Sequence, residues 1–262
     1  MTGSITSWLR SRISKVGAAR TALIVLTFAL LESLCRIGVL DRVTIIPPTE
    51  MAASLWDILK SGRFNADIAF TLFNVAAAIA LATSAGFFAG AALHSVPRLR
   101  RVSEPLLSAY YAIPTFVFYP LLIVMFGIGR VALIIMGAMF GVVAMIVNTM
   151  LGLDRVPPAV DKVGSILRLD ALRQLVLIRL PAASPHLVTG VRLAVAYSVI
   201  GIVAGEFILA TSGMGKRIAF AYDNFDNKTM YGMLLLLLVG VVIVNSALSV
   251  WENRLHRRFG QR

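Results

Sequence analysis

Residues 131–150 read VALIIMGAMFGVVAMIVNTM, a run of apolar and small residues without a single charge. A helix that crosses the hydrocarbon core of a bilayer needs about 20 mostly apolar residues, and this stretch has that length. Working outward from it, the sequence contains five more apolar stretches of similar length. They lie near residues 21–40, 69–93, 105–125, 187–209 and 230–250. The sequence therefore predicts an all-α, polytopic integral membrane protein with six transmembrane helices, organised as a single domain over residues 1–262.

The composition supports this fold class and excludes several others. Of the 262 residues, 58% are hydrophobic and 15% are charged, and the mean hydropathy is +0.82. One soluble core cannot bury that much apolar surface. The formal net charge of +12 would indicate a nucleic-acid partner in a soluble protein. Here the basic residues lie between apolar stretches, which favours a role in topology and contact with anionic membrane lipid, and no nucleic-acid partner is predicted.

The distribution of Lys and Arg predicts the orientation in the membrane. The two termini together with the second and fourth connections hold 16 of these residues, whereas the alternate connections hold seven. The positive-inside rule therefore places both termini and the long fourth connection in the cytoplasm. The first span carries Glu32 and Arg36 and is too long for a cleaved signal peptide, so we expect it to remain in the mature protein.

A search for catalytic signatures finds none. The three histidines, His94, His186 and His256, are far apart in the sequence, and no serine has a glycine two residues before it. A phosphate-binding loop around residues 210–217 would need glycine where Ala210 stands and Ser or Thr where Arg217 stands. The lone cysteine offers no disulfide or metal cluster. The sequence thus predicts a transport subunit without cofactor or metal, whose energy comes from another protein.

Few charges fall inside the predicted spans, and such charges are functional candidates. Glu32 and Arg36 are four residues apart on one helix face, which favours an ion pair that orients the first helix. Arg192 lies near the cytoplasmic start of the fifth span and can extend its side chain to the surface. Glu206 lies near the outer end of the same span; it either lines a polar path or hydrogen-bonds to a neighbouring helix.

Small residues and prolines mark two of the spans. Gly86 and Gly90 form a G-x-x-x-G element in the second span, a weak signal for close helix packing. The third span contains Pro105, Pro114 and Pro120. Prolines free backbone carbonyls that a polar path or neighbouring helices must satisfy, so this span is either a pore-lining helix or a kinked packing helix.

The fourth connection, residues 151–186, carries a helical pattern of its own. After two prolines, apolar residues follow helical spacing up to Leu167, which predicts one short amphipathic helix. Asp170 then suits the N-cap of a second short helix, which Pro181 and Pro185 are expected to end. Two such helices on the cytoplasmic side either bind a partner protein or lie on the membrane surface without one.

At this point the sequence resembles a known family. The connection ends in Ile178-Arg179-Leu180-Pro181, and Gly190-Val191-Arg192-Leu193-Ala194 follows it. Further along stand Ala204-Gly205-Glu206-Phe207 and Ser212-Gly213-Met214-Gly215. In order and spacing these pieces resemble the membrane permease subunits of ABC-type importers that serve a periplasmic binding protein, closest to the nitrate/sulfonate/taurine branch. The resemblance covers nearly the whole chain.

The cytoplasmic motif of that family runs E-A-A, three residues, Gly, nine residues, I-x-L-P. Counting back from Pro181, the E-A-A positions hold Lys162, Val163 and Gly164, and the Gly position holds Arg168. These residues depart from the family pattern. Asp170 and Gln174 occupy the family's Ser and Gln positions, which retains the chemistry of the helix cap.

The resemblance implies a location in the bacterial inner membrane, a homodimer around a central pathway, two ABC ATPase subunits and a periplasmic substrate-binding protein. The ATPase subunits would bind a coupling segment, residues 157–181. Its candidate contact residues are Lys162, Val163, Gly164, Arg168, Asp170, Leu172, Gln174, Ile178, Leu180 and Pro181. The pathway candidates are Pro114, Pro120, Asn148 and Glu206. The alternative function is a gradient-driven secondary transporter or channel, with a membrane-embedded enzyme a more distant third.

Overall fold

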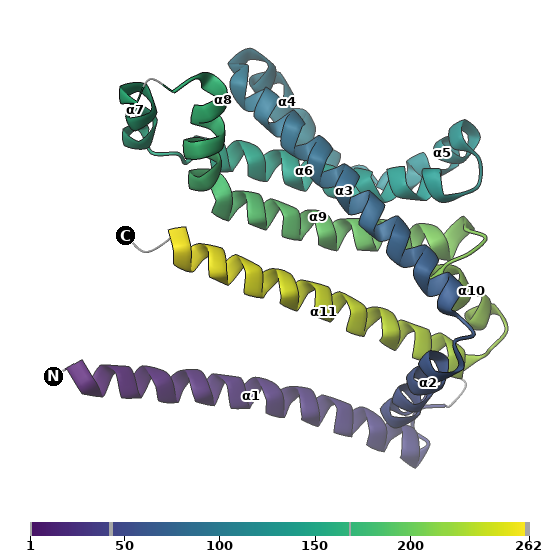
Figure 1. Cartoon of the computed structure of the whole chain (residues 1–262). Coiled ribbons are helices and arrows are strands. Elements are labelled where there is room, and N and C mark those ends of the chain that lie inside the picture. The colour runs from purple at the N-terminus through teal and green to yellow at the C-terminus, as the bar shows by residue number, and fades with distance from the viewer. Residues whose placement is uncertain (1, 42–43, 168, 260–262) are drawn as a thin grey trace.

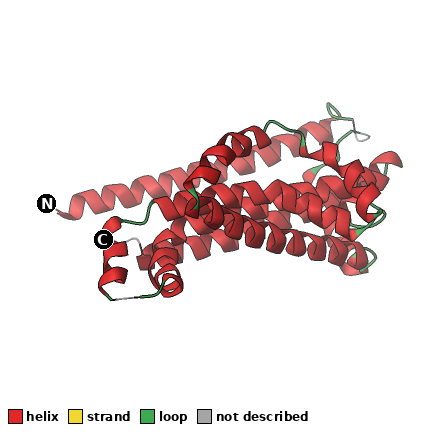
Figure 2. Ribbon diagram, turned by 90° about the horizontal axis from the view of Figure 1, so that it is seen from above, coloured by secondary structure: helices red, strands yellow, loops and turns green. Residues whose placement is uncertain are grey.

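A computed structural model describes residues 2–41, 44–167 and 169–259, and every regular element in these ranges is a helix (Figures 1 and 2). In chain order they are α1 (Thr2–Ile37), α2 (Pro48–Ser61), α3 (Asn65–Ser95), α4 (Pro97–Tyr110), the 3₁₀ turn η1 (Thr115–Phe118), α5 (Tyr119–Phe126), α6 (Arg130–Asp154), α7 (Pro158–Ile166), α8 (Ala171–Gln174), the π-helical turn η2 (Leu175–Arg179), α9 (Leu180–Leu209), α10 (Met214–Asp223) and α11 (Asn227–Phe259). The predicted all-α fold is confirmed for the described residues.

Helices α3, α6 and α9 pack together at the centre of the molecule. Leu133 and Met136 of α6 are buried against Ala78 of α3 and Ile202 of α9. Helix α6, which contains the charge-free stretch 131–150, is the most enclosed of the long apolar helices among the described residues. A stretch of 20 residues without a charge therefore forms the centre of the fold.

The G-x-x-x-G element brings α3 and α6 into close contact. A Cβ atom on Gly90 would lie 2.7 Å from the carbonyl oxygen of Ile146, and one on Gly86 would lie 2.8 Å from that of Val142. Only a residue without a side chain allows two backbones to approach so closely. The packing role predicted for this pair of glycines is confirmed.

The two ends of the helix bundle differ in what they hold. The first turns of α1 and the last turns of α11 lie at the same end as α7 and α8, whereas α2, α5 and α10 lie at the opposite end (Figure 1). At that opposite end Ile58 of α2, Ile218 of α10 and Met233 of α11 share one buried cluster. The sequence predicts that the end with the termini is cytoplasmic, and we call the opposite end the outer end.

Four helical stretches of the described chain are long and apolar enough to cross a membrane. They are Asn65–Ser95, Arg130–Asp154, Leu175–Ile208 and Asn227–Val250. A fifth is formed if Pro97–Tyr110 and Thr115–Phe126, which are bent by 96° relative to one another, count as one span. The single helix expected over residues 105–125 is therefore interrupted.

The first predicted span, residues 21–40, falls on α1 up to Ile37, where that helix ends. Glu32 and Arg36 form the predicted ion pair, with Arg36 Nε 2.7 Å from Glu32 Oε1. Glu32 also accepts hydrogen bonds from the backbone N–H and the hydroxyl of Thr49, at the start of α2. Glu32 therefore links the end of α1 to the start of α2.

Pro181 and Pro185 do not end a helix, contrary to the prediction. Pro181 lies in the first turn of α9 and Pro185 lies inside it. The five residues before α9 form a π-helical turn, Leu175–Arg179, which joins α8 to α9 without a break in the chain's helical path. A proline ring clashes with the carbonyl of the residue four positions earlier, and a widened π turn relieves that clash.

Candidate functional site

The break between α4 and η1 is set by local sequence. Pro114 has no N–H to continue the helical hydrogen bonds, and a residue that precedes a proline, here Ile113, disfavours the α conformation. The chain closes instead with two short turns, in which Ala112 N bonds to Ala109 O and Ile113 N bonds to Tyr110 O. The helix resumes with η1 after Pro114.

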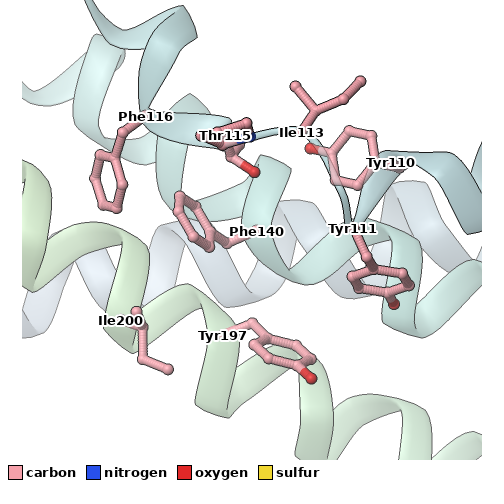
Figure 3. A pocket seen from close by; sticks show the side chains of 9 residues that line it. Tyr110, Tyr111, Ile113, Thr115, Phe116, Phe140, Tyr197 and Ile200 are labelled. Atoms are coloured by element: carbon pink, nitrogen blue, oxygen red, sulfur yellow. The ribbon is translucent and has the colours of Figure 1, made fainter.

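An aromatic pocket of about 320 Å³ lies at this break (Figure 3). Figure 3 shows the ring of Phe140 between Phe116 and the pair Tyr111 and Tyr197. Phe140 comes from α6, and Tyr197 and Ile200 come from α9. The rings of Phe116 and Phe140 are 4.9 Å apart. The full lining is Tyr110, Tyr111, Ile113, Pro114, Thr115, Phe116, Phe140, Tyr197 and Ile200.

The chemistry of this pocket is that of a contact surface rather than a reaction centre. None of its lining residues carries an acidic or basic side chain. Its polar side-chain groups are the hydroxyls of Thr115 and three tyrosines, and Tyr110 donates its hydroxyl to the carbonyl of Met139 at 2.8 Å. The pocket therefore presents aromatic faces and hydroxyl groups.

The structure brings one of the four predicted pathway residues into this pocket. Pro114 lines it, whereas Pro120 is exposed on α5 and is not part of its lining. Asn148 donates its amide to the carbonyl of Ala144 in its own helix. Glu206 is fully buried, with 0% of its surface exposed.

Glu206 joins three helices at the outer end. Its Oε2 accepts hydrogen bonds from the hydroxyl of Thr71 on α3 at 2.7 Å and from the N–H of Gly215 on α10 at 3.1 Å. The Thr71 hydroxyl in turn accepts the N–H of Met214 at 2.8 Å. Gly213 has φ +111, and a side chain there would overlap the Glu206 carboxylate. Of the two alternatives for Glu206, a hydrogen bond to a neighbouring helix is the one that the structure contains.

Asp67 completes the outer polar cluster, which we define as Asp67, Thr71, Glu206, Gly213–Gly215 and Arg217. Asp67 accepts the N–H of Gly213 at 3.0 Å and forms an ion pair with Arg217 at 2.7 Å. The sequence prediction placed Asp67 outside the second span. Helix α3 begins earlier, at Asn65, and Asp67 is buried within it. The cluster ties α10 to α3.

The coupling segment forms a compact unit at the end that holds the termini. Gly164 of α7 is buried, and a Cβ there would lie 3.0 Å from both Gln174 Cγ and Ile178 Cδ1. Helix α7 therefore packs on α8 and η2 at Gly164. Asp170 caps α8 as predicted, because its Oδ1 accepts the N–H of Arg173 at 3.1 Å.

Several apolar side chains of the coupling segment face outward. The exposed fractions are 79% for Ile166 and 63% for Leu177, and Leu167 and Val176 are exposed as well. Lys162 is also exposed, whereas Leu180 and Pro181 are half-buried at the start of α9. Arg168 lies outside the described residues, as do the side chains of Val163 and Leu172. The segment thus presents an apolar surface that the chain itself leaves uncovered.

Sequence reasoning missed the aromatic residues of the pocket. Tyr110 and Tyr111 stand three to four residues before Pro114, where a kink was one of the two expectations, so an aromatic pair close to a proline was an available signal. Phe140 and Tyr197 gave no such signal, because single aromatic residues in apolar helices are most often core residues. Only the fold brings these helices together.

Comparisons with known proteins agree with this architecture. The sequence profile of the family described as binding-protein-dependent transport system inner membrane component matches residues 82–261. The taurine transport system permease protein of Escherichia coli is 26% identical over 221 residues, covering 83% of this chain and 76% of that protein. The nitrate import permease protein of Synechococcus elongatus is 26% identical over 190 residues, covering 72% and 68%.

Among solved structures, an inward-facing methionine ABC transporter superimposes with a TM-score of 0.64 at 17% identity, over 73% of this chain and 95% of that chain. This likeness supports the fold, and the family match extends over more than half of the chain. The resemblance inferred from the sequence motifs is confirmed. The chain therefore belongs to the binding-protein-dependent transport system inner membrane components, and it is a membrane-embedded permease subunit of an ABC-type import system rather than an enzyme.

Proposed function

We propose that this chain forms the transmembrane pathway for a small solute that a periplasmic binding protein delivers, and that a separate ABC ATPase subunit drives the transport. The solute is of the sulfonate, nitrate or taurine type, or resembles a thiamine precursor. The names of the relatives, a taurine and a nitrate permease, support the first group. The uncharged aromatic pocket at the α4–η1 break is the candidate for a contact with the solute on its way.

The exposed apolar surface of the coupling segment is the observation that carries this proposal. Ile166 and Leu177 belong to α7 and η2, which pack on one another at Gly164. Exposed apolar side chains gathered at one place mark a protein contact or a membrane contact. The motif ending in Pro181 supports an ATPase subunit as the partner of this surface, and we expect two copies for a dimeric permease.

The test is co-purification with the ABC ATPase subunit of the same import system. The variants Ile166→Asp and Leu177→Asp would each place a carboxylate in the contact with the ATPase. Binding should weaken, because burying a charge that loses its water without gaining a partner is strongly disfavoured. We expect each to lower the recovered ATPase at least tenfold. Ile128→Asp, at a comparably exposed residue of the outer end, should leave the recovery unchanged.

A homodimer in the bacterial inner membrane, with six spans per copy and both termini in the cytoplasm, completes the proposal. The bent pair α4–α5 carries the exposed apolar residues Leu106, Leu121 and Val124, and a second copy packed against them would enclose the pathway. A cysteine at Val124 should then cross-link two copies in native membranes, whereas one at Ile243, an exposed apolar residue of α11, should not.

A gradient-driven transporter or channel is the alternative function. It would move solute in vesicles that contain the chain alone, under an imposed ion gradient and without ATP. Uptake of that kind, together with an unchanged recovery of the ATPase in both coupling-segment variants, would contradict the proposal.

A further inference from the structure

An ion-pair cluster joins α4 to α6 at the end of the bundle that holds the coupling segment. The two terminal guanidinium nitrogens of Arg100 donate to the carboxylate of Asp154, Nη1 to Oδ1 and Nη2 to Oδ2, each at 2.7 Å. Arg100 Nε also donates to Glu104 at 2.6 Å, and His94 Nδ1 lies 3.1 Å from Asp154 Oδ1. The side chains of Arg100 and Asp154 are 28% and 31% exposed, so water screens the pair only in part.

Helix α4 depends on polar contacts of this kind. None of its residues is buried, and Val102 and Leu106 are among its exposed apolar side chains. Besides the Arg100–Asp154 pair, a second polar contact to α6 is the hydrogen bond from Tyr110 to the carbonyl of Met139. The two contacts are separated by about 15 Å along α4, at 1.5 Å per residue. They hold α4 to α6 near its two ends.

The position of each partner connects the two functional regions. Asp154 is the last residue of α6, and the coupling helix α7 begins at Pro158, a short distance along the chain. Arg100 lies in the first turn of α4, whose last residue, Tyr110, lines the aromatic pocket. A displacement of the coupling segment therefore reaches Asp154 through the backbone, and α4 through the ion pair.

We propose that the Arg100–Asp154 pair is the contact through which movement of the coupling segment is passed to α4 and to the aromatic pocket at its end. The inference rests on the proposed function, and it assigns both residues a positioning role in coupling. A guanidinium suits this role because its bidentate geometry fixes orientation as well as distance. A lysine would keep the charge but not the orientation.

The experiment uses the complete complex of permease and ATPase in lipid nanodiscs, with the stimulation of ATP hydrolysis by the loaded binding protein as the readout. We expect Arg100→Gln and Asp154→Asn to assemble with the ATPase but to lose stimulation at least tenfold. Arg100→Lys should lose less, and the exchanged pair Arg100→Asp with Asp154→Arg should recover stimulation to within about threefold of the original. Arg101→Gln, an exposed neighbour on α4, is the matched control.

Three outcomes would overturn the proposal. Stimulation in Arg100→Gln equal to that in Arg101→Gln is the first. The second is a loss that the exchanged pair does not recover although the protein accumulates and binds the ATPase. If Arg100→Gln fails to accumulate, Arg100→Lys decides instead, and normal stimulation in it would be the third. Failure of the proposed function gives a different result, since the unaltered complex would then show no stimulation by the binding protein.

Discussion

Replacing Thr71 by valine tests the outer polar cluster most directly, because valine keeps the shape of threonine and removes only the hydroxyl. That hydroxyl donates to Glu206 Oε2 at 2.7 Å and accepts the N–H of Met214 at 2.8 Å. Both Thr71 and Glu206 are buried. The substitution leaves Oε2 with the backbone donor of Gly215 and leaves the N–H of Met214 without its acceptor.

The expected cost follows from these two losses. A buried polar group that loses its partner costs about 1–3 kcal/mol, and more when the group is charged. Because Oε2 keeps one donor, we expect a total of about 2–4 kcal/mol for Thr71→Val. For chains of about this size each kcal/mol lowers the melting temperature by about 2–4 °C. The melting temperature of the purified permease in detergent should therefore fall by about 4–16 °C.

Thr83→Val on the same helix is the matched control. Thr83 donates its hydroxyl to the carbonyls of Ile79 and Ala80 one turn earlier, so its removal leaves only carbonyls that already accept helical hydrogen bonds. We expect a change of less than about 1 kcal/mol for Thr83→Val. Equal melting temperatures for the two variants would refute the assignment of the Thr71 hydroxyl as a link between α3 and the α9–α10 connection.

Three further predictions concern packing, capping and topology. Gly90→Leu should separate α3 from α6 and lower stability by about 3 kcal/mol or more, whereas Gly240→Leu, where an added Cβ meets no atom within 4 Å, should be tolerated; thermal unfolding of both variants decides this. Asp170→Ala should weaken the α8 cap by about 1 kcal/mol, measured as faster hydrogen exchange at the amide of Arg173. A cysteine placed at Ser61 should react with an impermeant thiol reagent in intact cells and one at Arg173 only after permeabilisation, since the Lys and Arg distribution places them on opposite sides; the reverse labelling would contradict the topology.

The sequence predicted those features that depend on neighbouring residues in the chain. A long charge-free stretch is sufficient to predict α6, and spacing alone indicates the Glu32–Arg36 pair. The cap at Asp170 is likewise local, because its carboxylate accepts the N–H of a residue three positions later. The glycine pair in α3 was a weaker case, because glycine is common in membrane helices and only the facing backbone of α6 gives Gly86 and Gly90 their role.

The features that sequence could not supply depend on residues far apart in the chain. Glu206 and Thr71 are 135 residues apart, and nothing near Glu206 in the sequence indicates a partner. Arg100 and Asp154 are 54 residues apart. From the sequence, Arg100 contributes only to the Lys and Arg count that sets topology, and Asp154 lies outside the predicted spans. The prolines of the third span indicated a kink as one alternative, but the 96° bend between α4 and the η1–α5 stretch was not predictable from residues that remain apolar on both sides of Pro114.

The kinds of contact that hold the helices indicate which of them moves most easily. The contact of α3 with α6 is made by glycines against backbone atoms, and that of α6 with α9 includes Gly141 against the backbone of Ala194. Separating such surfaces loses close packing that water cannot replace. Helix α4 buries none of its side chains, and its ion pair and its Tyr110 hydrogen bond can both exchange their partners for water. Displacement of α4 along α6 therefore costs less free energy than displacement of any helix in the α3–α6–α9 centre. Such a displacement changes the aromatic pocket directly, because Tyr110 belongs to α4 and also lines the pocket.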